Sequence, residues 1–401
     1  MDTNEHRLHL KRGLPFRSGW AQKRIDAVGQ RLADDHVVTI YCRQYWDGPD
    51  EITRKGMTLR SVAPGARLYN GDQRRSIREA IEFAARLVPT LRSHIDEHDL
   101  VVASVFPYFP VLSSKLCTLL TDTPIVVTWH EVWGDYWDEY LGRLSPFGKS
   151  VERLTAEIPH HAVAVSEITA DRLAKIGPSR DEIDLIPNGI NVDRIQNAPL
   201  PEKSFRADGK PGFDIVFAGR HVEVKHVDLL LDAFDRVADS YDATLGVLGN
   251  GPLHDELREQ ADALNHAGRV RFLGFLDDYD DVLGHLRAAR VFASPSTREG
   301  FGITYAEAMA AGCTVIGANH PDSAASEVIG DAGYLTDPTV DDVADALSRA
   351  LDGYQPPTAP TTRAMRFDWD TVAEETEGVY RRVLDHHRTR TRPVKRLTGA
   401  D

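Results

Sequence analysis

The sequence predicts an α/β protein with two doubly wound parallel sheets. Short apolar, β-branched runs recur along the chain and alternate with helical patterns, which is typical of parallel strands joined by helices. A Pro-, Gly- and charge-rich stretch at residues 195–210 separates two such series and is typical of a linker. The chain has 401 residues, 42% of them hydrophobic, so it is long enough for two domains with sizeable cores.

The first series, within residues 1–194, is expected to form an N-terminal Rossmann-like domain. Its strand patterns lie at residues 37–41, 99–106, 124–129 and 162–166. Helical patterns lie at residues 22–32, 74–92 and 167–176. We also expect a short, basic first strand at residues 7–10.

The second series, residues 211–362, is expected to form a C-terminal Rossmann-like domain. Its strand patterns lie at residues 213–218, 244–248, 270–275, 291–294, 314–316 and 333–335. A Pro-rich break at residues 355–362 precedes a helical pattern at residues 369–386. We therefore expect a C-terminal helix within residues 363–390 and a basic tail at residues 391–401.

Composition and charge exclude several classes of function. The formal net charge of −14 argues against general nucleic-acid binding. The same acidic balance fits either a salt-adapted, acidic proteome or ordinary compositional bias. Cys42, Cys117 and Cys313 have neither metal-ligand nor disulfide spacing, which favours a reducing compartment. The polar start of the chain and the lack of any apolar run of ~18 residues favour a cytoplasmic protein.

Residues 294–312 contain the strongest chemical pattern. The buried-strand pattern at residues 291–294 runs into a turn holding Gly300, Phe301 and Gly302, and a helical pattern starts at Ile303. A strand, a Gly-rich turn and a helix start place backbone N–H groups where a phosphate can bind. Two glutamates, Glu299 and Glu307, flank this turn; carboxylates bind phosphate poorly but accept hydrogen bonds from sugar hydroxyls. The stretch therefore predicts a nucleotide-sugar pocket.

Two cations follow another strand of the same half. Gly219 and Arg220 come directly after the strand at residues 213–218, and Lys225 precedes the next helix. Ligands of open α/β sheets bind outside the carboxyl ends of strands, where two cations would neutralise a diphosphate and stabilise it as a leaving group. Gly249, in a G-N-G-P stretch after the next strand, allows either close approach of a ligand or a tight turn.

Three further patterns admit both a functional and a structural interpretation. His130 ends the strand at residues 124–129 and is either a hydrogen-bonding group for a sugar or a structural histidine. Ser18 and Gly19 form either a loop near the ligand or a plain turn. The acidic residues 277–281 are better explained as a helix-capping loop than as a cation site, and no metal site is predicted.

A basic face is expected on the N-terminal half. It suits either an anionic membrane surface with a phospholipid-type acceptor or a solvated helix face. Its residues are Lys11, Arg12, Arg17, Arg74, Arg75 and Arg78.

Taken together, these motifs resemble glycosyltransferase family 4, the retaining group 1 glycosyltransferases with the GT-B fold. The resemblance spans nearly the whole chain: Ser18-Gly19, His130, V-S-E at 165–167, P-N-G-I-N at 187–191, G-R-x4-K at 219–225, G-N-G-P at 249–252, and P-S-x-x-E-G-F-G-x4-E-A-M-A-x-G at 295–312. It implies two Rossmann-like domains facing a cleft, with the donor on the C-terminal and the acceptor on the N-terminal domain. It also implies a terminal helix that crosses back to the N-terminal domain, and retaining transfer with neither metal nor cofactor.

The resemblance also implies roles for individual residues. Glu299 would contact the donor sugar, Glu307 the ribose, Arg220 and Lys225 the diphosphate, and His130 the region near the donor sugar. The catalytic set is thus Arg220, Lys225, Glu299 and His130. The donor-binding set is Glu307, Gly300, Phe301, Gly302, Ile303, Gly219, Gly249, Ser18 and Gly19. The chain departs from the family at its start, where R-L-H-L and Ser18-Gly19 replace a clear apolar strand and a Gly-Gly loop.

The expected activity is transfer of a sugar from a UDP- or GDP-type donor to a hydroxyl acceptor, in glycan, glycolipid or cell-surface polysaccharide synthesis. The acceptor is soluble or lipid-linked; a lipid-linked one implies peripheral contact with the inner face of an anionic membrane. Two alternatives stay open: a GT-B nucleotide-sugar epimerase or hydrolase, and a non-catalytic nucleotide-sugar-binding partner subunit. A dinucleotide oxidoreductase lacks support because no G-x-G-x-x-G follows a strand.

Overall fold

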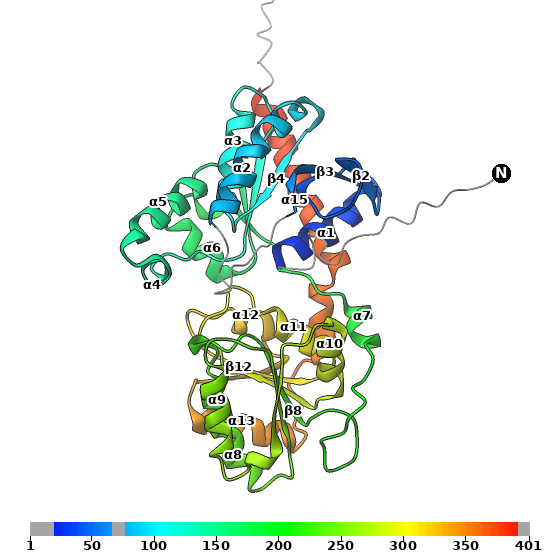
Figure 1. Cartoon of the computed structure of the whole chain (residues 1–401), viewed down its shortest axis with the longest axis vertical. Helices are drawn as coiled ribbons and strands as arrows, with labels where there is room; N and C mark the ends of the chain where they lie inside the picture. The colour runs from blue at the N-terminus through cyan, green and yellow to red at the C-terminus, as the bar shows by residue number, and fades with distance from the viewer. Residues whose placement is uncertain (1–19, 66–76, 392–401) are drawn as a thin grey trace, which may run out of the picture. The chain divides into compact units, whose positions relative to one another are not determined.

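The computed structural model describes residues 20–65 and 77–391, and it confirms an α/β fold with parallel sheets. The described chain divides into two compact units (Figure 1). Unit 1 contains the residues up to Val165, Thr169–Ile186 and the residues from Ala373 onward; unit 2 contains Ser166–Ile168 and Pro187–Val372. None of the helices within the described ranges is long and apolar enough to cross a membrane.

Unit 1 contains a four-stranded parallel sheet in the order β4-β5-β6-β7. Its strands are β4 (Val101–Ser104), β5 (Ile125–Trp129), β6 (His161–Ala164) and β7 (Ile183–Leu185). Every residue of β5 is buried, as a continuous apolar run predicts for a central strand. The patterns for β4, β5 and β6 are confirmed. The sequence analysis missed β7, because three residues containing an aspartate show no periodicity.

A second, three-stranded sheet of unit 1 has the order β1-β3-β2. It comprises β1 (Thr39–Gln44), β2 (Glu51–Arg54) and β3 (Met57–Pro64). β1 and β3 are parallel, whereas β2 and β3 form an antiparallel hairpin. The hairpin turn is Lys55-Gly56, with φ angles of 51° and 77°, as a two-residue mirror-image turn requires. The sequence analysis did not predict this antiparallel hairpin. The strand expected at residues 7–10 lies outside the described residues.

The helices of unit 1 follow the expected alternation. Those expected at residues 22–32, 74–92 and 167–176 correspond to α1 (Trp20–Leu32), α2 (Ile77–Arg92) and α6 (Glu167–Ala174). The others are α3 (Phe109–Thr118), α4 (Tyr136–Leu141), α5 (Ser145–Ala156) and most of α15 (Trp369–Thr391). α15 begins in unit 2, and α6 has its first two residues there.

Unit 2 is built on a six-stranded, fully parallel sheet in the order β10-β9-β8-β11-β12-β13. Its strands are β8 (Ile215–Ala218), β9 (Leu245–Leu248), β10 (Val270–Gly274), β11 (Val291–Ser294), β12 (Thr314–Ala318) and β13 (Gly333–Thr336). All six confirm the predicted strands. The chain order runs outward from β8 to β10 and then reverses to continue from β11 to β13, so the reversal falls between β8 and β11.

Helices cover both faces of this sheet. Figure 1 shows α8 (Val227–Ala238), α9 (His254–Asp262) and α13 (Val340–Leu351) on one side. On the other side lie α10 (Tyr279–Ala288), α11 (Ile303–Ala310) and α12 (Ala325–Ile329). The two short helices α7 (Val192–Asn197) and α14 (Pro360–Ala364) complete the unit. Fully buried apolar side chains, such as Leu230, Phe234 and Leu347, join helices and strands in one core, each contributing about 1.5–3 kcal/mol.

Candidate active site

The loops that follow β8 and β11 meet at the point where the strand order of unit 2 reverses. At such a switch point, neighbouring loops leave the sheet toward opposite faces and open a crevice at the carboxyl ends of the strands. The loop after β8 carries Gly219, Arg220 and Lys225, and the loop after β11 carries Glu299 and Gly300–Gly302. The fold thus brings together two motifs that are distant in the sequence.

Hydrogen bonds fasten these two loops to each other. The backbone carbonyl of Val224 accepts from the Thr297 amide at 3.0 Å and from the Ser296 hydroxyl at 3.1 Å. His226, held in the left-handed region with φ of 48°, places its Nε2 3.0 Å from Thr297 Oγ1. These contacts fix the position of the loop after β8 relative to the loop after β11.

Lys225 and Glu299, both predicted as catalytic, form an ion pair through Lys225 Nζ and Glu299 Oε1. Their side chains are only 21% and 13% exposed, so the pair is poorly screened by water. The Glu299 amide donates to the Asp322 carbonyl, and the Glu299 carbonyl accepts from the Ala324 amide, at 3.2 and 3.0 Å. The backbone on both sides of the carboxylate is thus fixed.

The Gly-rich turn leads directly into α11. Gly302 has φ of 82°, and a Cβ there would lie 2.5 Å from the ring of Tyr305, so the position requires glycine. Phe301 is buried against Phe367, edge to face at 5.6 Å, and Ile303 is buried as well. The Gly300 carbonyl accepts from the Ser166 hydroxyl at 2.7 Å. The start of α11 therefore offers N–H groups from a rigid turn.

Glu307 lies on α11 and is almost entirely buried, with 4% exposure. The Tyr279 hydroxyl donates to Glu307 Oε2 at 2.6 Å. Burial, followed by the Glu307 charge, raises the pKa of Tyr279 well above its ordinary value, so the phenol stays protonated and remains a donor. The sequence analysis missed Tyr279, which is the first residue of α10, closely after the end of β10. Asp278 caps α10 through the Asp280 amide, confirming the capping interpretation of this acidic loop.

Gly219 and Gly249 bring the loops after β8 and β9 into direct backbone contact. The Gly219 amide donates to the Leu248 carbonyl at 3.1 Å, and the Gly249 amide to the Gly274 carbonyl at 2.8 Å. A Cβ on Gly249 would lie 1.8 Å from the Gly219 carbonyl oxygen. Arg220 is exposed beside them, and its guanidinium pairs with no carboxylate of the described chain.

His221, next to Arg220, is fully buried and stacks on His254 with ring centroids 5.1 Å apart. Their Nδ1 atoms lie 3.0 Å apart, and Phe272 packs edge-on against both rings. Burial, followed by the neighbouring His254, lowers the pKa of His221 to about 4. A buried, neutral His221 that stacks on His254 thus supports the loop that carries Arg220.

The remaining predicted residues lie in unit 1 or outside the described chain. His130 follows β5, and its Nε2 lies 3.0 Å from the Ser104 hydroxyl at the end of β4. Ser18 and Gly19 lie outside the described residues. Of the predicted basic face, only Arg78 is described, and it is exposed on α2.

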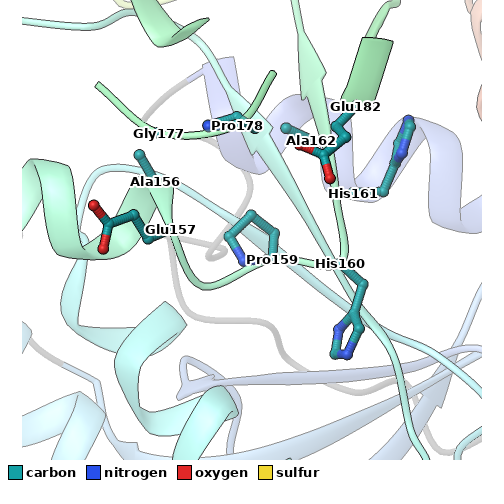
Figure 2. A pocket seen from close by; sticks show the side chains of 9 residues that line it. All are labelled: Ala156, Glu157, Pro159, His160, His161, Ala162, Gly177, Pro178 and Glu182. Atoms are coloured by element: carbon teal, nitrogen blue, oxygen red, sulfur yellow. The ribbon is translucent and has the colours of Figure 1, made fainter. Parts of the chain in front are cut away.

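One cavity of unit 1, of about 230 Å³, lies at the amino end of β6 (Figure 2). None of the predicted site residues lines it. Its two histidines point in different directions and have structural partners. His160 Nδ1 accepts from the Ile125 amide at 3.0 Å, and His161 Nε2 lies 2.8 Å from Asp184 Oδ2. Both histidines of the cavity wall therefore hold neighbouring strands together.

Comparisons with known proteins agree with the fold. Sucrose-phosphate synthase from Thermosynechococcus elongatus, a solved structure, superposes with a TM-score of 0.69 at 18% identity over 92% of this chain and 94% of that chain. The chain therefore has the GT-B fold, with a parallel α/β sheet in each of its two units.

The chain belongs to glycosyltransferase family 4. The family models "Glycosyltransferase Family 4" and "Glycosyl transferases group 1" match residues 21–194 and 212–353. A phosphatidyl-myo-inositol mannosyltransferase of Mycolicibacterium smegmatis is 30% identical over 341 residues, 79% of this chain and 78% of the relative. A GDP-mannose-dependent alpha-(1-6)-phosphatidylinositol monomannoside mannosyltransferase of Mycobacterium tuberculosis is 31% identical over 51% of this chain and 56% of the relative. The chain is therefore a glycosyltransferase that uses a nucleotide-sugar donor.

Replacement of Gly249 by alanine should destabilise unit 2. The φ of 114° disfavours any side chain, and the new Cβ would overlap the Gly219 carbonyl. We expect a loss of about 2 kcal/mol or more in the free energy of unfolding, measured by urea denaturation. Gly268→Ala, whose Cβ would meet nothing within 4 Å, is the matched control. Equal stability of the two variants would contradict the close packing of the loops.

Stability should fall on acidification because of His221. Its pKa of about 4 in the folded state is below the ordinary 6.5, so the unfolded chain binds more protons between these values. The stabilisation is present above pH 6.5 and is lost as the pH falls toward 4, by about 1.4 kcal/mol for each pKa unit of difference. His221→Phe should flatten this part of the urea-unfolding profile. Identical pH slopes in the wild type and this variant would refute the assignment.

Proposed function

We propose that this chain transfers a mannosyl group from GDP-mannose to a hydroxyl of a phosphatidylinositol-type glycolipid, with retention and without a metal ion. The convergence of Arg220, Lys225, Glu299 and Glu307 at one switch point carries the proposal. The names of the two mannosyltransferase relatives support the choice of donor and acceptor.

The donor is held by groups of unit 2. Arg220, Lys225 and the N–H groups at the start of α11 bind the diphosphate. Glu299 accepts from hydroxyls of the mannose. Glu307, hydrogen-bonded by Tyr279, accepts from the ribose hydroxyls. Because Lys225 is already paired with Glu299 in the structure, the cation is positioned before the diphosphate arrives.

The reaction breaks the bond between the anomeric carbon and the β-phosphate oxygen. The acceptor oxygen forms the new bond to the anomeric carbon, and its proton passes to the departing β-phosphate oxygen, so no separate base is needed. Arg220 and Lys225 stabilise the negative charge that develops on the leaving diphosphate. We assign the acceptor to unit 1, where His130 hydrogen-bonds the sugar being transferred.

Access to a lipid acceptor implies contact with a membrane surface. Arg78 is exposed on α2 and is one of the six Lys and Arg residues of the basic face that the sequence predicts. Such positive charge would be attracted to an anionic leaflet. We propose that the enzyme acts peripherally at the inner face of the cytoplasmic membrane.

The function is tested by incubating the chain with labelled GDP-mannose and phosphatidylinositol vesicles. We expect a mannolipid product, little transfer from UDP-sugars, and full activity after exhaustive chelation. Arg220→Ala should lower kcat by about 100-fold or more through loss of leaving-group stabilisation, whereas Arg258→Ala, an exposed arginine on α9, should not.

Three outcomes would contradict this assignment. Near-normal turnover by Arg220→Ala would show that Arg220 does not stabilise the leaving diphosphate. GDP-mannose cleavage that is independent of acceptor would identify a hydrolase. Loss of activity on chelation that magnesium or manganese restores would refute the metal-free mechanism.

Removal of the Glu307 carboxylate should mainly weaken donor binding. We expect Glu307→Ala to raise the Kd for GDP about tenfold or more, and Tyr279→Phe to raise it less, because only one hydrogen bond to the carboxylate is lost. Isothermal titration calorimetry measures both, with the exposed Glu256→Ala on α9 as control. An unchanged Kd combined with loss of the chemical step would show that Glu307 acts in chemistry and not on the ribose.

A further inference from the structure

Unit 1 buries a carboxylate that the proposed mechanism leaves unused. Glu152 lies on α5 with 2% exposure. Its Oε1 accepts from the Tyr108 hydroxyl and the Trp133 amide, both at 2.8 Å. Its Oε2 accepts from the Gly134 amide at 3.0 Å and from Trp137 Nε1 at 3.1 Å. Four donors on two oxygens offset the desolvation of the charge, and none of them is a cation.

Three of the four donors come from one segment: Trp133 and Gly134 lie in the loop that leads from β5 into α4, and Trp137 lies in the first turn of α4. This loop begins at His130 and reaches Gly134, which has φ of 51°. Trp133 and Gly134 lie outside the strands, so no neighbouring strand accepts hydrogen bonds from their amides. The Glu152 carboxylate accepts these hydrogen bonds instead. Two contacts therefore restrain the loop: Ser104 at the His130 ring and Glu152 at the turn.

Aromatic rings enclose the carboxylate. Tyr108 and Trp137 have ring centroids 5.9 Å apart, and Trp133 and Trp137 4.7 Å apart. Burial, followed by the Glu152 charge, raises the pKa of Tyr108 well above its ordinary value, so its hydroxyl stays protonated and remains a donor. The arrangement is costly for a purely structural purpose, because an apolar side chain of similar size often packs equally well in place of a buried charge.

We propose that Glu152 is a positioning residue for His130: it holds the loop after β5 in the one conformation that presents the His130 ring for glycosyl transfer. This inference rests on the proposed function, specifically on the role of His130. Glu152 itself touches neither donor nor acceptor.

Glu152→Gln is the informative variant because it keeps the side-chain shape. Its amide oxygen can serve one pair of donors, but its NH2 group must then face the other pair, so two hydrogen bonds are lost. We expect kcat to fall about tenfold or more with an unchanged Kd for GDP, since the donor is held by unit 2. Glu157→Gln, an exposed glutamate just beyond α5, is the matched control and should behave as wild type.

A double-mutant cycle with His130→Ala separates positioning from general destabilisation. If Glu152 acts through His130, adding Glu152→Gln to His130→Ala should lower kcat by less than twofold. Tyr108→Phe, which removes only one donor, should show a smaller loss of kcat that likewise disappears in the His130→Ala background; it serves as the variant if Glu152→Gln does not fold. The inference would be overturned if the fold-losses of kcat of the two single variants multiplied in the double variant. Full turnover by Glu152→Gln would overturn it as well.

Hydrogen exchange distinguishes this inference from the proposed function. The amides of Trp133 and Gly134 should exchange at least tenfold faster in Glu152→Gln than in wild type, whatever the substrate of the enzyme. If the wild type transfers no mannose while these amides lose protection, the proposed function has failed. If the wild type transfers mannose and these amides exchange unchanged, the role of Glu152 has failed.

Discussion

The link between the loops after β8 and β11 is the contact on which the site of unit 2 depends. The Val224 carbonyl binds two donors from residues 296 and 297, and Lys225 pairs with Glu299. The strands are neighbours in the sheet, and the order reverses between them, so their loops meet at its carboxyl edge. The backbone thus fixes the loop that carries Lys225, the cation that the proposed function assigns to the diphosphate.

Three carboxylates of the chain show three ways of holding a negative charge in a partly dry environment. Glu299 is paired with a cation, Glu307 accepts from a phenol, and Glu152 accepts from four neutral donors. The spacing of Glu299 and Glu307 alone would also suit an acid–base pair for glycoside hydrolysis. In the structure Glu299 is paired with the Lys225 cation and Glu307 accepts from the Tyr279 hydroxyl, and the proposed function assigns both carboxylates to hydroxyl groups of the donor.

The sheet of unit 2 was predictable because parallel strands buried on both faces are continuous apolar runs, as in residues 291–294 and 314–316. The hairpin of β2 and β3 was missed, although alternation in residues 51–60 and the Lys55-Gly56 turn were visible signals. β7 has too few residues to show a period. Strands were recognised where burial on both faces makes them continuously apolar. They were overlooked where they are short or half-exposed.

The sequence by itself determined the family and predicted the residues of the donor side, because the spacing of glycines, cations and carboxylates within one stretch of chain can be read from the sequence alone. Only the tertiary structure decided which groups support them. Tyr279 and Glu307 are 28 positions apart, Ser166 and Gly300 134 positions, and Tyr108 and Glu152 44 positions. Hydrogen bonds between such distant residues leave no pattern in composition or periodicity; they exist because the packing of helices and loops on the sheets brings separate parts of the chain together.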